Sequence, residues 1–321
     1  SLDKSTNSLN IKEDKIITIN DTLIIPADYS LTLNKGSILN FKENTGLVIK
    51  GGLTIDGSDK KQVTLQGHSN KNWSGILVLG NSKNVVINNI KVIGGNGIFN
   101  GISYRGAFTI HNSNAYINNS IFTENLSEDA LNLVQIKAFL NNITISNTKS
   151  DGLDVDYGEV KIVNSNFINI GSSSGADAID VSKTKLTIES SYLNNITDKA
   201  ISVGENSTAT ILNTRISRAF VGIVAKDSSK INMSNIRLDS ITFADTMSYK
   251  KKLHFSGAEI IASNIESFLD NHLVQTNSYS IINGEIIRPE NIDIDFLYDT
   301  VMESMKWILG KKKNIHFLQT I

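Results

Sequence analysis

Asp154, Asp156 and Asp180 are the residues whose types and spacing could carry chemistry in this 321-residue sequence. Asp154 and Asp156 are two positions apart, so in a β-strand their side chains lie on one face, about 7 Å apart. Asp180 occupies the place of Asp154 in the next copy of a sequence repeat, which predicts a separation of about 5 Å between neighbouring strands. Carboxylates this close repel each other unless a cation binds among them or one of them takes up a proton.

Two kinds of chemistry follow from such a patch. Calcium prefers clustered oxygen ligands, so Asp154, Asp156 and Asp180 form a candidate calcium site. Paired carboxylates also hydrolyse glycosidic bonds. A separation of about 5 Å suits retention of configuration, and the longer distance between Asp156 and Asp180 suits inversion. The remaining interpretation is a solvated acidic face without chemistry.

A repeat places these aspartates. Its copies begin at residues 129, 151, 177, 199 and 221, with spacings of 22, 26, 22 and 22 residues. Position two of each copy is Ala or Gly, and positions three and five are apolar. This alternation predicts a strand with positions three and five on the inner face and positions four and six on the outer face. A fixed period of this length indicates a solenoid.

A second strand in each copy ends at a recurrent Asn or Ser. These residues are Asn89, Asn119, Asn142, Asn164, Ser190, Asn213 and Asn235. The same 26-residue interval appears in this series, between Asn164 and Ser190, and residues 171–174 lie inside it in both series. We therefore predict a loop insertion there, and stacked turn Asn residues that bond to one another along the solenoid.

Further polar residues are expected beside the acidic patch. The predicted substrate-binding residues are Arg105, Asn132, Asp156, Ser182 and Lys250, and the predicted catalytic residues are Asp154, Asp180 and Lys226. Arg105 would lie beyond one end of the patch, in a copy at residues 101–105. Lys226 and Lys250 would lie beyond the other end, Lys250 in a last copy that begins at Asp245. Lys226 lies two strands from Asp180, nearly 10 Å away by about 4.8 Å per strand. The position-one residues Asp129, Asp151 and Asp177 are expected to accept backbone N–H groups at turns.

The composition excludes some classes of function. The net charge of −1 gives no field that attracts nucleic acid or an anionic membrane. Cysteine is absent, which excludes disulfides and thiol catalysis, and no run of about 18 apolar residues could span a membrane. The chain begins at Ser1, which is consistent with a processed or trimmed part of a longer protein, and other domains of it are expected partners.

Residues 296–309 change character, with Phe296, Leu297, Val301, Met305, Ile308 and Leu309 on one helical face. Asp293 or Asp295 would cap the start of this helix, and Gly310 suits its end. We expect it to cover the open end of the solenoid. A membrane-surface helix and a contact to another domain are the alternatives. The predicted division is a solenoid over residues 1–290, with residues 1–25 as cap or first rung, and a helical cap over residues 291–321.

These patterns predict an all-β fold, a right-handed parallel β-helix with about 22–24 residues per coil and a C-terminal capping α-helix. The turns Asn119-Ser-Ile-Phe and Asn164-Ser-Asn-Phe, with the openings Asp151-Gly-Leu-Asp and Asp177-Ala-Ile-Asp, resemble the parallel β-helix repeat of the pectate-lyase-like superfamily. The resemblance covers residues 30–285. The run from Asp198 to Glu205 also resembles β-helix regions of spore-coat-H-like proteins.

The resemblance implies polysaccharide as the partner and an extracellular or cell-envelope localisation. Pectate-lyase-type members use calcium to hold an acidic sugar while a Lys or Arg removes its C5 proton, which would give Lys226 the role of base. Two hypotheses therefore stand. One is a carbohydrate-binding or structural surface module without a catalytic motif. The other is a lyase or hydrolase that acts on an acidic polysaccharide, with calcium as the implied cofactor.

Overall fold

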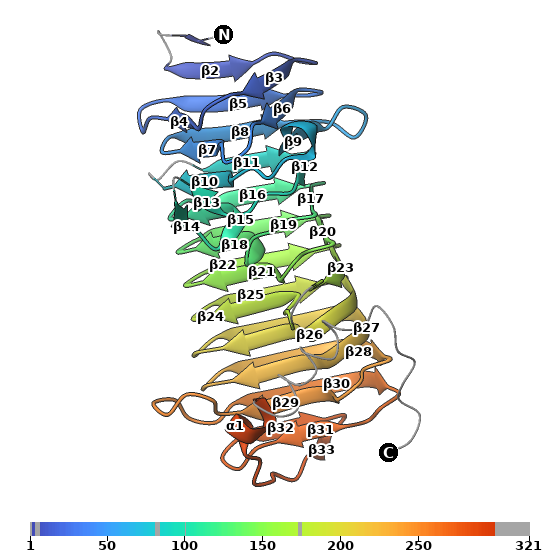
Figure 1. Cartoon of the computed structure of the whole chain (residues 1–321). Helices are drawn as coiled ribbons and strands as arrows, with labels where there is room; N and C mark the ends of the chain where they lie inside the picture. The colour runs from blue at the N-terminus through green and yellow to red at the C-terminus, as the bar shows by residue number, and fades with distance from the viewer. Residues whose placement is uncertain (1, 4–6, 81–83, 100, 173–174, 299–321) are drawn as a thin grey trace.

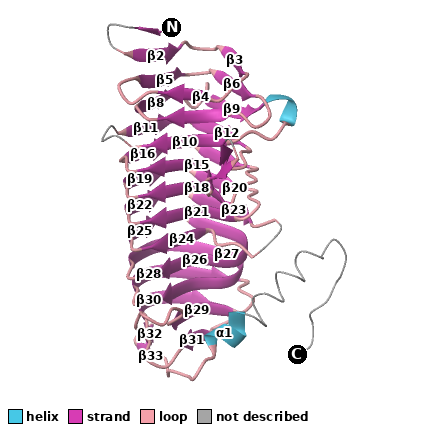
Figure 2. Cartoon of the chain, turned by 60° about the vertical axis from the view of Figure 1, so that its left-hand side comes forward, coloured by secondary structure: helices cyan, strands magenta, loops and turns pink. Residues whose placement is uncertain are grey.

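The chain forms one elongated parallel β-solenoid of about twelve turns in the described residues (Figure 1). This computed structural model describes the whole chain apart from residues 1, 4–6, 81–83, 100, 173–174 and 299–321. The strands stack from the N-terminal end to the C-terminal end of a rod (Figure 2). The predicted all-β parallel solenoid is confirmed. Among the described residues, no helix has the length and apolar character needed to cross a membrane.

Each turn contributes one strand to each of three parallel sheets, which we call sheets A, B and C. Sheet A carries the acidic patch. Its strands are β4 Leu23–Ile25, β7 Gly46–Ile49, β10 Gly75–Leu79, β15 Gly106–His111, β18 Asp129–Val134, β21 Asp151–Asp156, β24 Ile179–Ser182, the last part of β26 Tyr192–Gly204, the last part of β27 Thr208–Lys226, β29 Ala244–Tyr249 and β31 His272–Val274.

Sheet B precedes sheet C in every turn. The strands of sheet B are β2 Ser8–Ile11, β5 Ser30–Asn34, β8 Gly52–Asp56, β11 Val85–Asn88, β16 Ala115–Asn118, β19 Lys137–Asn141, β22 Glu159–Val163, β25 Lys185–Glu189, the first parts of β27, β28 Lys230–Asp239 and β30 Glu259–Ser267, and β32 Tyr279–Ile282. The strands of sheet C are β3 Ile16–Ile19, β6 Ile38–Phe41, β9 Val63–Gly67, β12 Ile90–Ile93, β17 Ile121–Thr123, β20 Thr144–Ser146, β23 Asn166–Ile170 and further parts of β26, β27, β28 and β30.

A few short elements lie outside this pattern. They are β1 Leu2–Asp3 antiparallel to β2, the hairpin β13 Ile98–Phe99 and β14 Ile102–Ser103, β33 Glu285–Ile286 antiparallel to β32, the 3-10 turn His68–Asn70 and helix α1 Ile294–Phe296.

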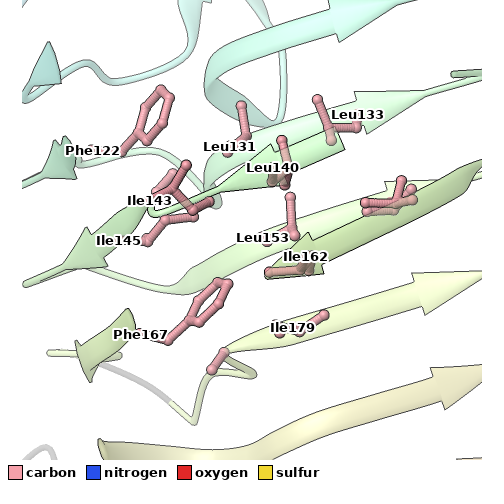
Figure 3. Close-up of a cluster of buried hydrophobic side chains, with 14 of the residues drawn as sticks. Phe122, Leu131, Leu133, Leu140, Ile143, Ile145, Leu153, Ile162, Phe167 and Ile179 are labelled. Carbon is pink, nitrogen blue, oxygen red and sulfur yellow. The ribbon is translucent and has the colours of Figure 1, made fainter. Parts of the chain in front are cut away.

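The core consists of apolar columns inside the rod. Leu131, Leu153 and Ile179 are paired in register on β18, β21 and β24, and none of them is exposed (Figure 3). Phe122 and Phe167 are also fully buried in this region. Because side chains alternate along a strand, the inward positions three and five fix the outward direction of positions four and six.

Asn residues in left-handed backbone conformation turn the chain from sheet B to sheet C. The seven recurrent positions predicted from the sequence, Ser190 included, have φ between 50° and 56°. The Asn142 side chain donates to Asn119 Oδ1 at 2.8 Å, and Asn235 donates to Asn213 at 2.9 Å. The predicted Asn stacking is thus confirmed. The longer interval also falls where predicted, between β23 and β24.

The C-terminal helix is shorter than predicted in the described part of the chain. Only α1 Ile294–Phe296 is an α-helix, and Asp293 caps it by accepting from Phe296 N at 3.0 Å. Residues 299–309 of the predicted helix lie outside the described residues. Ile294 and Leu297 pack on Val224 and Met247, which point outward from sheet A. The described segment therefore covers part of a sheet face.

Two of the predicted repeat copies are out of register. Residues 101–105 belong to the hairpin and the loop after it, and the strand of this turn is β15, with Thr109 beside Asn132. Tyr249, rather than Lys250, pairs with Lys226. Arg105 and Lys250 therefore do not lie on the predicted outer rows. In both turns, the sheet A strand begins at a different residue from the one at which the predicted copy begins.

Candidate functional site

The outer face of sheet A carries a row of polar residues, which we call the polar strip: Asn132, Asp154, Asp156, Asp180, Ser182 and Ser202. In register, Asn132 pairs with Asp154, Asp154 with Asp180, and Asp180 with Ser202. Asp156 pairs with Ser182. The structure therefore brings Asp154, Asp156 and Asp180 together as predicted, on neighbouring strands about 4.8 Å apart.

Asn132 connects two carboxyl groups at the N-terminal end of the polar strip. Its Nδ2 atom donates to Asp129 Oδ2 and to Asp154 Oδ2, both at 3.1 Å. Burial, followed by the nearby carboxylates of Asp156 and Asp180, raises the pKa of Asp154 to about 7. Asp154 is therefore a carboxyl group that exchanges its proton near neutral pH.

Asp180 is in the opposite electrostatic state. Burial alone would raise its pKa, but the Lys226 and Lys199 ammonium groups outweigh burial and hold the pKa of Asp180 below its usual value. Lys226 Nζ lies 3.4 Å from Asp180 Oδ1. Two adjacent carboxyl groups thus have pKa values that differ in direction, and this pattern is typical of acid–base pairs.

Glycine at position 204 makes the Lys226 contact possible. The two backbones are two strands apart, and the lysine side chain spans this distance by lying over Gly204. A Cβ atom at position 204 would lie 2.5 Å from Lys226 Cε. The predicted distance of about 10 Å holds for the two backbones, and the length of the lysine side chain brings its ammonium group to Asp180.

The base role predicted for Lys226 has no support in its electrostatics. Burial disfavours the charged ammonium group, but Asp180 more than offsets it and raises the pKa of Lys226 above its usual value. A raised pKa keeps the lysine protonated and disfavours proton removal, so the base role of Lys226 stays a prediction.

A second ion-pair group lies beside the polar strip. Glu205 accepts from Ser182 Oγ and from the Lys252 ammonium group. Burial alone would raise the pKa of Glu205, but these two contacts outweigh burial and hold the pKa below its usual value. Glu205 and Lys252 are 47 residues apart in the sequence, and no repeat pattern signals their contact.

A buried lysine follows the polar strip toward the C-terminal end. Lys199 Nζ lies 3.0 Å from Asp177 Oδ1 and 2.7 Å from Asp198 Oδ2. Burial disfavours the charged form of Lys199, but the two carboxylates outweigh burial and raise the pKa of Lys199. For Asp177, burial outweighs the nearby Lys199 ammonium group and raises the pKa to about 6. The ring of Tyr298 lies over Lys199, and its hydroxyl is 2.6 Å from that of Tyr249. The polar strip therefore ends against a covered face.

Two of the three position-one aspartates, Asp151 and Asp177, accept backbone N–H groups as predicted, whereas Asp129 accepts from the Asn132 side chain. Asp151 Oδ1 accepts from the backbone N–H of Asp177, and Asp177 Oδ1 accepts from that of Lys199, both at 3.0 Å. These bonds connect neighbouring turns. Sequence analysis identified this role but missed that Asp177 also forms an ion pair.

Arg105 and Lys250 reach different places. Arg105 lies in the loop before β15, and its Nη1 atom is 4.0 Å from Asp154 Oδ2 and 3.8 Å from Glu128 Oε1. Its side chain is 64% exposed, so it can contact a ligand. Lys250 follows the end of β29, and its backbone N–H donates to Gln275.

The ion pair of Lys226 with Asp180 disfavours calcium binding by Asp154, Asp156 and Asp180. Within the described residues, no group of three or more His, Asp or Glu side chains has the geometry of a metal site. Lys226 already supplies the positive charge at Asp180. The donor set therefore does not fit a calcium cage as it stands, and the calcium site stays a prediction.

The comparisons with known proteins give a likeness in fold. No protein-family model matches the chain, and no curated protein matches it. The A-module of a mannuronan C-5 epimerase from Azotobacter vinelandii is similar at 11% identity and a TM-score of 0.43, over 86% of this chain and 90% of that chain. An alginate lyase from Paenibacillus sp. has 10% identity and a TM-score of 0.37, over 76% and 93%. A polygalacturonase from Erwinia carotovora has 12% identity and a TM-score of 0.35, over 83% and 86%.

Proposed function

We propose that this chain is a parallel β-helix module that binds a linear polysaccharide on the outer face of sheet A. The observation that carries the proposal is the register of Asp154 with Asp180, which places hydrogen-bonding groups on successive strands. Asp156, Asp180 and Ser182 are partly exposed. A sugar chain along the rod would meet Asp156 on β21 and Asp180 and Ser182 on β24, on strands about 4.8 Å apart.

The proposed ligand would contact both signs of charge. Arg105 is exposed beside Asp154 and would pair with an acidic group of a sugar, while Asp156 and Ser182 would bond to hydroxyl groups. With such a ligand, we propose that the protein acts outside the cell or in the cell envelope, as part of a longer protein where further domains are present. A solenoid with a purely structural role would bind no polysaccharide.

Hydrolysis of a glycosidic bond is the second candidate function. It is favoured by the opposed pKa values of Asp154 and Asp180, one raised to about 7 and one lowered. Asp154 would donate a proton to the leaving oxygen, and ionised Asp180 would attack or stabilise the anomeric carbon. Strand spacing of about 4.8 Å between the two residues is close to the carboxylate separation of retaining enzymes.

The binding proposal is tested on an array of acidic and neutral polysaccharides. We expect the wild-type chain to bind, and Arg105→Ala and Asp156→Asn to lose most of the binding, because both side chains are accessible. Asp56→Asn, on sheet B, is the matched control and should bind as the wild type does. Binding that is absent, or that is unchanged in both sheet A variants, would overturn the proposal.

The hydrolase version is tested separately on the polysaccharides that bind. We expect release of reducing ends by the wild type and its loss in Asp154→Asn. A chain that binds but releases no reducing ends is a binding module, and the hydrolase version is then wrong.

A further inference from the structure

Sheet B carries a groove on its outer face that the proposed sheet A site does not include. It crosses four neighbouring strands, β16, β19, β22 and β25, which pair in register. Its volume is about 290 Å³. Its lining forms two rows in register across the strands, which we call its walls: one has Tyr116, Phe139 and Lys161, and the other has Lys137, Glu159 and Lys185. Because each wall repeats along the rod, the groove runs parallel to the solenoid axis.

The aromatic wall offers a stacking surface. Tyr116 and Phe139 pair directly between β16 and β19, so the two aromatic side chains start from neighbouring backbones about 4.8 Å apart. The Tyr116 side chain is 48% exposed and points away from the core, since its neighbours Ala115 and Ile117 are buried. Flat apolar rings of this kind pack against the apolar faces of sugar rings.

The opposite wall is charged, and its side chains form ion pairs with one another. Glu159 forms ion pairs with Lys137 at 3.4 Å and with Lys185 at 3.1 Å. The hydrogen bond from Lys185, followed by that from Lys137, lowers the pKa of Glu159, so this carboxylate stays ionised at neutral pH. Lys161 also lines the groove, and its partner Glu189 lies outside it, at 3.5 Å. The three ammonium groups of the lining are thus opposed by two carboxylates, Glu159 and Glu189, and the remaining excess of one positive charge favours an anionic ligand.

We infer that this groove is a second carbohydrate site, which binds a linear oligosaccharide bearing carboxylate or sulfate groups. Sugar rings would stack on Tyr116 and Phe139, and their anionic groups would pair with Lys161 and with the outer lysines. The inference does not rest on the sheet A site, because the two surfaces share no residue.

A peptide fits the groove less well. The groove lies on the face of a sheet whose backbone N–H and C=O groups are already bonded between strands. An extended peptide would find no backbone partners there, whereas strand addition requires a free edge. Sugar hydroxyl groups need only side-chain partners, and Glu159, the lysines and Thr187 provide them.

The test is calorimetry of the full chain with four probes: tetragalacturonate, a sulfated chondroitin tetrasaccharide, cellotetraose and a glutamate-rich octapeptide. We expect one of the two anionic oligosaccharides to bind more tightly than cellotetraose and the peptide, and the tighter one identifies carboxylate or sulfate as the recognised group. Tyr116→Ala and Phe139→Ala should each weaken its binding by roughly tenfold. Lys161→Ala should weaken it and reduce its salt dependence.

Matched controls separate this surface from the rest of the rod. Tyr192→Ala removes a tyrosine from sheet C and should leave the affinity unchanged. Asp56→Asn, on β8 of sheet B and outside the groove, should also leave it unchanged. The inference is overturned if neither anionic oligosaccharide binds, if both aromatic variants bind as the wild type does, or if the peptide binds more tightly.

Discussion

At the residue scale, the carboxyl group of Asp154 makes the stability of the folded chain depend on pH. Its pKa in the folded chain is about 7, above its usual value of 3.8, so the folded state binds a proton that the unfolded state releases between these pH values. Its contribution to stability is therefore present below about pH 4 and is lost as the pH rises to about 7. Burial of the charged carboxylate is the physical cause.

The substitution Asp154→Asn should abolish this loss of stability at high pH. The amide oxygen can still accept from Asn132, and no charge forms at high pH. We expect the variant to be more stable than the wild type at pH 8, by roughly 2–4 kcal/mol, and similar to it at pH 4. Thermal melts across this range measure the difference. Parallel pH profiles for the two proteins would contradict the raised pKa.

Gly204 sets the position of Lys226. A methyl group at position 204 would displace the lysine from Asp180, because it would lie 2.5 Å from Lys226 Cε. We expect Gly204→Ala to cost roughly 1–3 kcal/mol and to raise the pKa of Asp180, since this carboxylate loses its partner. Carboxyl NMR titration and denaturant unfolding measure the two effects.

A double-mutant cycle is the control for the Gly204 prediction. In a Lys226→Ala background the long side chain that would collide with the added methyl group is absent, so Gly204→Ala should then have little effect. Equal costs in both backgrounds would show that glycine acts through the backbone, and the positioning role would be wrong.

At the scale of elements, the turns between sheets B and C combine two physical requirements. Asn142 adopts φ 52° and its amide donates to Asn119. Asn142→Gly keeps the backbone freedom and loses the bond, at a cost of roughly 0.5–1.5 kcal/mol. Asn142→Ala loses both and should cost about 1 kcal/mol more. Denaturant unfolding compares them. A glycine variant as stable as the wild type would mean that the amide bond contributes nothing.

Alternation explains which elements could be predicted. Leu131, Leu153 and Ile179 have to face the core, and a slip by one residue would expose the whole inner face, so the register of Asp154 with Asp180 follows from the sequence. The copy at residue 245 fails this test. Thr246 and Ser248 occupy the inward positions of this strand. Because both are polar, the apolar alternation is lost, and the copy predicted from the sequence is misaligned by one residue.

Contacts between distant turns could not be predicted in the same way. The repeat pattern places the backbone of each residue but does not show how far its side chain extends. The ion pairs of Lys226 with Asp180 and of Lys252 with Glu205 were therefore not predicted. Arg105 contacts Asp154 of the polar strip from the loop before β15, whereas the sequence pattern placed Arg105 on a strand. Long, flexible charged side chains therefore limit what a repeat can tell about a site.

At the scale of the whole molecule, each turn contacts mainly its two neighbours, so stability is close to a sum over turns and their interfaces. Leu153 is fully buried in the middle of the rod, and Ile282 is buried in β32, near the C-terminal end. Leu153→Ala should cost roughly 2–5 kcal/mol and raise hydrogen exchange in β18 and β24 on both sides. Ile282→Ala should raise exchange only around β30 and β32, because a terminal turn can open alone. Hydrogen exchange read by mass spectrometry distinguishes the two patterns. If Ile282→Ala raised exchange along the entire rod, the solenoid would unfold as one unit, and the polar strip would be sensitive to substitutions at either end.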